Sequence, residues 1–63
     1  MCLSTAYKND RQGGEVLMSN VMTIACEPGK VVLTDLMERQ MVVEGILKEA
    51  SLVDGYVVIA AEE

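Results

Sequence analysis

The chain has 63 residues and a net charge of −5, from ten acidic and five basic side chains. Hydrophobic residues make up 51% and charged residues 24%, which is typical of a single folded domain spanning residues 1–63. The acidic balance disfavours nucleic acid as a partner, because such binding depends on lysine and arginine contacts to phosphates. No apolar run approaches the roughly 20 residues that a membrane span needs.

The first half of the chain alternates strand-forming stretches with turn signals. Glu27-Pro28-Gly29-Lys30 places proline and glycine where a type II turn needs them, which predicts a tight hairpin. Ser19 and Asn20 predict a sharp bend. The strands expected before the hairpin are 2–8, 15–18 and 21–27, with a loop over 9–14.

The second half continues this pattern with strands over 30–34, 39–49 and 56–61. Gly45 predicts a bulge or a sharp coil inside the long strand, and Asp54-Gly55 predicts a hairpin after it. Leu36–Leu52 is also compatible with a helix, since Glu, Lys, Met and Ala favour one. Val42, Val43 and Gly45 favour the strand interpretation.

These elements predict an all-β fold, in which five to six short antiparallel strands curl into a small barrel. A chain of this length cannot build a two-layer sandwich, and closure protects the strand edges. The only aromatic residues are two tyrosines, so we expect valine, leucine, isoleucine and methionine to fill the core. Small cores are often supplemented by a partner subunit, which favours a dimer.

Few residues are suited to catalysis, and we expect that the protein is not an enzyme. Histidine is absent, and the two cysteines form no Cys-x-x-Cys pair. Gly13-Gly14 lacks the lysine and hydroxyl residue of a phosphate-binding loop. With no secretory segment in the sequence, a reducing cytoplasm is the expected location.

Cys2 is the candidate metal ligand. Beside Met1 at the start of the sequence, it offers a thiolate together with its own amide nitrogen and a terminal amine. Such sulfur and nitrogen donors suit square-planar Ni(II) or Cu(II). Two copies of Cys2 in a two-fold dimer could supply two sulfurs and two nitrogens to one ion. The alternative is that Cys2 has no function.

The other sulfur-containing side chains have simpler interpretations. Cys26 alternates with Met22 and Ile24, which predicts that it points into the core as a small hydrophobe. Methionine thioethers could bind Cu(I), but the spacing contains no Met-x-x-Met cluster and is more typical of core filling. The methionines concerned are Met18, Met22, Met37 and Met41.

The sequence resembles the CooT family of small nickel-binding accessory proteins of carbon monoxide dehydrogenase. The resemblance covers essentially the whole chain in order. It rests on Met1-Cys2, on Gly14 to Val16, on the hairpin with KVVLTD, on the ME-x-Q-x-VVEG stretch from Met37 to Gly45, and on the apolar finish from Tyr56 to Glu62.

The resemblance implies a small SH3-like or Sm-like barrel that forms a homodimer. It also implies Ni(II) binding through Cys2 of each subunit, for maturation of the nickel site of carbon monoxide dehydrogenase. That enzyme or its maturation proteins would be partners. Two alternatives remain: an Sm-like RNA-binding module, and a non-catalytic domain that docks a larger protein. Cys26 has no counterpart in the family pattern.

Overall fold

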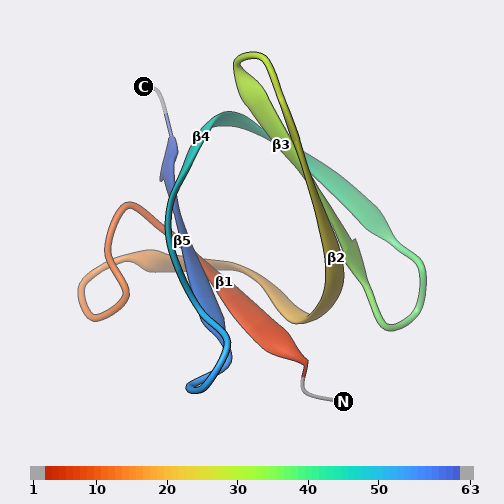
Figure 1. Cartoon of the computed structure of the whole chain (residues 1–63), viewed down its shortest axis with the longest axis horizontal. Helices are drawn as coiled ribbons and strands as arrows, with labels where there is room; N and C mark the ends of the chain where they lie inside the picture. Colours follow the sequence, from red (N-terminus) through yellow and green to blue (C-terminus); the bar gives the residue numbers. More distant parts are fainter. Residues whose placement is uncertain (1–2, 62–63) are drawn as a thin grey trace.

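The protein is a five-stranded β-barrel (Figure 1). The computed structural model describes residues 3–61, and within that range it contains no helix. The strands are β1 (Ser4–Lys8), β2 (Glu15–Glu27), β3 (Lys30–Asp35), β4 (Gln40–Ser51) and β5 (Tyr56–Ala61). The prediction of an all-β barrel is confirmed.

The sheet closes through strands that lie far apart in the sequence. Each strand pairs antiparallel with the next one along the chain. The ring is completed by β1 and β5, which pair parallel from Thr5–Tyr56 to Lys8–Ile59. This parallel contact departs from the all-antiparallel arrangement that the sequence predicts. It follows from the number of strands: when consecutive strands alternate in direction around a closed ring of five, the first and the fifth run the same way.

Two long strands each serve two parts of the barrel (Figure 1). The first part of β2 pairs with β1, in a ladder that ends at Val21, and the second part pairs with β3. The prediction of separate strands over 15–18 and 21–27 is therefore wrong. Asn20 takes a left-handed φ of 57°, which asparagine tolerates better than most residues. It bends the strand at the predicted place without ending it.

The other long strand, β4, changes partner at Gly45. Glu44 is the last residue paired with β3, and Gly45 is the first paired with β5. A Cβ atom on Gly45 would lie 2.2 Å from the carbonyl oxygen of Ala60, so only glycine permits this approach of the two backbones. The sharp coil predicted here is confirmed, while the register shift lies further on, between Leu47 and Glu49. Residues 36–52 form no helix.

The predicted tight turns are confirmed. Gly29 and Gly55 have φ values of 78° and 77°, the left-handed conformation that each turn requires. The first turn joins β2 to β3, and the second precedes β5. Both glycines therefore allow the chain to reverse direction so that consecutive strands can pair.

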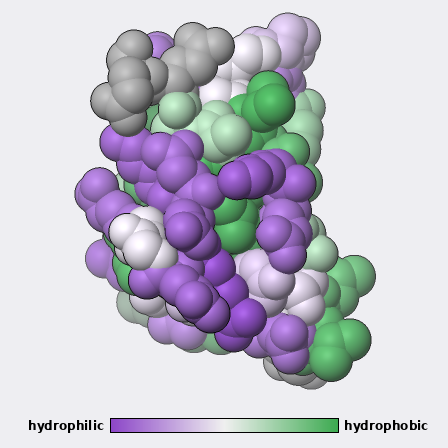
Figure 2. All heavy atoms as spheres, turned by 90° about the vertical axis from the view of Figure 1, so that its left-hand side faces the viewer, coloured by the Kyte–Doolittle hydropathy of each residue, from purple (hydrophilic) through white to green (hydrophobic). Residues whose placement is uncertain are grey.

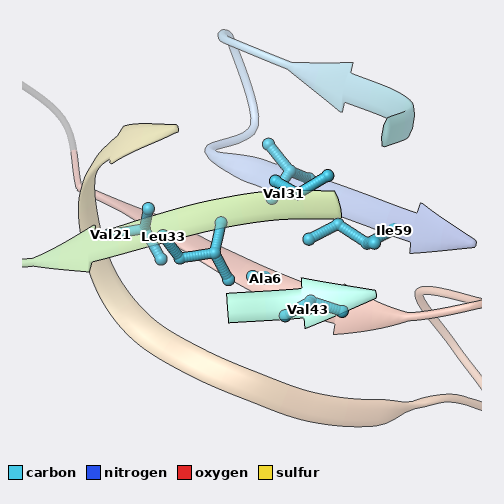
Figure 3. Close-up of a cluster of buried hydrophobic side chains, with 7 residues drawn as sticks. Ala6, Val21, Val31, Leu33, Val43 and Ile59 are labelled. Atoms are coloured by element: carbon cyan, nitrogen blue, oxygen red, sulfur yellow. The ribbon is translucent and has the colours of Figure 1, made fainter. Parts of the chain in front are cut away.

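The core is built from branched aliphatic side chains (Figure 3). Every strand contributes to this buried cluster, which contains Ala6, Val21, Val31, Leu33, Val43, Val57 and Ile59. No methionine belongs to it, which corrects that part of the composition-based prediction. Met18 packs against the cluster from its margin.

Candidate functional site

The start of β1 lies beside the turn between β4 and β5. The amide of Thr5 donates a hydrogen bond to the carbonyl oxygen of Gly55 over 3.0 Å. A Cβ atom on Gly55 would lie 3.4 Å from the carbonyl oxygen of Leu3. Cys2, the predicted metal ligand, is bonded to Leu3 but lies outside the described residues, so its placement is not part of this geometry.

The β4–β5 turn is held by its own polar atoms. The amide of Gly55 donates to the carbonyl of Ser51 over 3.0 Å, and the amide of Asp54 donates to the Ser51 hydroxyl over 3.1 Å. At its tip, Leu52 and Val53 are 85% and 94% exposed, more than any other large hydrophobic residue described. The sequence alone did not single out this apolar pair, because a Leu-Val pair carries no local signal of exposure.

Tyr56 connects this turn to the neighbouring loop. Its hydroxyl donates a 2.7 Å hydrogen bond to Glu49 Oε2, and the Arg11 guanidinium carbon lies 4.1 Å from the centre of its ring. The hydrogen bond to Glu49 raises the pKa of Tyr56, because ionisation would remove the donated proton and place two negative charges together. The phenol therefore stays neutral, and Tyr56 ties β4, β5 and the 9–14 loop together.

A second polar cluster caps the turn between β3 and β4. The Asp35 carboxylate accepts 2.9 Å hydrogen bonds from the amides of Met37 and Arg39. Its other oxygen accepts from Arg39 Nε at 3.0 Å. These interactions lower the pKa of Asp35, and the amide of Arg39 is their largest source. Because three donors already occupy this carboxylate, we assign it a structural role.

A groove of about 500 Å³ lies beside this turn. Three of the four methionines considered for Cu(I) line it, together with residues of β2 and of the β3–β4 turn. These are Met18, Met37 and Met41. The fold thus gathers thioethers that are dispersed in the sequence, although Met22 is not part of the lining.

Cys26 is exposed, so the prediction that it points into the core is wrong. Its strand position opposite Val31 is on the face that the alternation predicts. However, it lies at the end of the β2–β3 hairpin, beyond Val21, where the ladder between β1 and β2 ends. At this position β1 no longer pairs with β2, whereas Val31 on β3 remains buried through its pairing with β4.

Over residues 3–61, no group of three or more histidine, cysteine, aspartate or glutamate side chains is arranged to hold a metal ion. The metal prediction for Cys2 therefore depends on the chemistry of the chain start and not on a cluster within the barrel. The same part of the chain contains no helix that is long and apolar enough to cross a membrane.

The described residues form a small closed β-barrel of five strands. A family model described as "CO dehydrogenase accessory protein CooT" matches residues 1–60. The chain belongs to this family of accessory proteins.

A crystal structure of a CooT protein from Carboxydothermus hydrogenoformans has the same fold, with a TM-score of 0.84. The match covers 98% of this chain and 100% of that one, at 18% sequence identity. At this level of identity, the likeness concerns the fold alone. No curated protein matches the sequence.

Proposed function

We propose that this protein is a nickel-binding metallochaperone that supports maturation of the nickel site of carbon monoxide dehydrogenase. The observation that carries the proposal is the family match, which covers residues 1–60 and therefore includes Cys2. The cargo is Ni(II), held by Cys2 from each subunit of a cytoplasmic homodimer. Partners would be carbon monoxide dehydrogenase or its maturation proteins.

Donor chemistry supports nickel at Cys2. A thiolate with an adjacent backbone nitrogen is a strong-field pair, and two such pairs complete the square-planar set that Ni(II) favours. Because the thiol must lose its proton before it binds, nickel affinity should rise with pH. The net charge of −5 favours a cation over RNA as the ligand.

The test is native mass spectrometry of the wild type and two matched cysteine variants with added Ni(II). We expect one nickel per dimer in the wild type and none in Cys2→Ser. Cys26→Ser is the control, because Cys26 is also an exposed free thiol, and it should bind nickel as the wild type does. Far-UV circular dichroism would verify that both variants fold.

Nickel retained by folded Cys2→Ser would refute the proposal. Loss of nickel from Cys26→Ser would refute the assignment of the ligand, since nickel would then depend on the hairpin thiol. A single nickel on a wild-type monomer would refute the shared site.

A further inference from the structure

The most exposed apolar residues of the molecule lie on the β4–β5 turn. Leu52 and Val53 are 85% and 94% exposed, and hydrogen bonds around Ser51 fix the turn that presents them. Figure 2 shows apolar side chains projecting at the lower edge of the molecule, the end at which this turn lies in Figure 1, with further apolar patches at the centre and upper edge of the same face. The barrel does not need these side chains for its own core.

This turn is also the segment that contacts the start of the chain. Gly55 accepts the hydrogen bond from Thr5, and its backbone approaches the carbonyl of Leu3. Leu3 is the residue after Cys2. The turn that carries the apolar pair is therefore hydrogen-bonded to β1, the strand that follows Cys2 in the sequence.

We propose that Leu52 and Val53 form a contact with a second copy of this chain, next to the nickel that the two copies share. This inference rests on the proposed function and deepens it. If both copies of Cys2 bind one ion, the two Leu3 residues are joined by a short path of bonds. That path consists of two peptide units, two cysteine side chains and two metal–sulfur bonds. The separation of the two Leu3 residues is therefore under about 20 Å.

The separation allowed between the two Leu3 residues is smaller than the longer dimensions of the barrel, so the two subunits must touch. The principal extents of the barrel are 31, 24 and 16 Å, so two such bodies joined over that separation must approach with their chain-start ends facing each other. The β4–β5 turn borders that end. In a two-fold dimer the same patch occurs on both subunits, so each turn can pack against the partner and exclude water from the bound ion.

Charge supports a second copy as the occupant. Glu49 and Asp54 flank the turn, and Arg11 lies over Tyr56 beside them. The rim thus carries both signs of charge around an apolar centre, the arrangement expected of a protein–protein contact. A two-fold pairing can place the basic group of one subunit near the acidic groups of the other.

The experiment compares Leu52→Ser/Val53→Ser with Val42→Ser/Ile46→Ser and the wild type. The control pair is also apolar and exposed, at 57% and 64%, but lies within β4. Sedimentation equilibrium over a dilution series would give the dimer dissociation constant, with and without Ni(II). Native mass spectrometry would give the nickel content of each species.

We expect the turn variant to weaken the dimer by at least about 100-fold, because each substitution acts twice across the two-fold axis. The control variant should remain within a few-fold of wild type. A turn variant as dimeric as wild type would overturn the inference, as would equal weakening by both variants. Circular dichroism should show both variants folded.

The failure of this inference is distinct from failure of the proposed function. If the wild type binds no nickel, the proposed function fails, and the dimerisation of the turn variant alone decides whether Leu52 and Val53 are a subunit contact. If the wild-type dimer binds one nickel and the turn variant does so with unchanged affinity, the nickel function stands and the contact is refuted.

Discussion

Replacing Gly45 by alanine tests whether barrel closure depends on the close approach of β4 to β5. The added methyl group would lie 2.2 Å from the Ala60 carbonyl oxygen and 2.8 Å from the Ala61 Cα atom. Both neighbours are backbone atoms of β5, so relief requires movement of the whole strand. Gly29→Ala is the control, since its φ is also positive but no atom lies within 4 Å of the new carbon.

The expected cost follows from these two environments. A left-handed backbone costs a non-glycine residue about 1–2 kcal/mol, which is the whole effect expected for Gly29→Ala. Gly45→Ala adds overpacking of about 1–3 kcal/mol. A 63-residue domain has a total stability of about 3–9 kcal/mol. Gly45→Ala should therefore remove a larger part of this stability than Gly29→Ala does.

Urea unfolding monitored by far-UV circular dichroism measures the difference. With a slope of about 1 kcal/mol per molar urea for a small domain, the midpoint of Gly45→Ala should fall about 1–3 M further than that of Gly29→Ala. Equal midpoints would refute the reasoning, because they would show that β4 and β5 can separate without cost. A partly unfolded Gly45→Ala sample before any urea is added would agree with it.

Three further predictions concern the core and the two polar clusters. Leu33→Ala should cost about 2–5 kcal/mol in urea unfolding, because Leu33 is fully buried, whereas exposed Val42→Ala should cost under about 0.5 kcal/mol; similar losses would contradict the core assignment. The lowered pKa of Asp35 means that its stabilising effect is present above the unfolded pKa of about 3.9 and is lost as pH falls through the lower folded value. Asp35→Asn should therefore lose less stability in acid than the wild type does. The melting temperature measured between pH 2 and 5 tests this, and the same fall with decreasing pH in both proteins would argue against it. Glu49→Gln should lower the pKa of Tyr56, measured by NMR titration, since Glu49 is the main cause of its elevation; no change would refute that cause.

The parts of the fold that were predicted correctly have local causes. Pro28-Gly29 and Asp54-Gly55 specify their turns through backbone conformations that those residues favour. Within residues 36–52, β-branched Val42 and Val43 indicated a strand against several good helix formers. The prediction succeeded because β4 is flanked by β3 and β5, where such side chains pack well on a pleated surface.

The parts that were missed depend on contacts between distant segments. The parallel pairing of β1 with β5 has no local signal, since it joins Thr5 to Tyr56. The continuity of β2 through Asn20 depends on β1 and β3, which pair with its two halves. Cys26 shows the same limit: it pairs with buried Val31, yet its own side chain is exposed, which alternation along the strand does not reveal.

The same distinction applies to the candidate site. Cys2 could be proposed from donor chemistry and family resemblance, both of which are properties of the sequence. Leu52 and Val53 could not be connected to it, because nearly fifty residues of chain separate them and the hydrogen bond from Thr5 to Gly55 exists only in the folded barrel.

A metal site at the start of the chain is compatible with a core as small as this one. β1 is paired on one side with β2 and on the other with β5, so the residues that follow Cys2 are held by two ladders. If a second copy supplies the remaining ligands, the barrel does not need a polar cavity inside its aliphatic core. Burying polar groups in such a cavity would lower the free energy of unfolding, which is small for a 63-residue domain. On this argument, weakening the β1–β5 ladder should reduce nickel affinity before it unfolds the barrel. Thr5→Pro, which removes the amide that donates to Gly55, would show this in nickel titrations as a loss of affinity in a protein that retains its circular dichroism spectrum; a folded variant with wild-type affinity would contradict it.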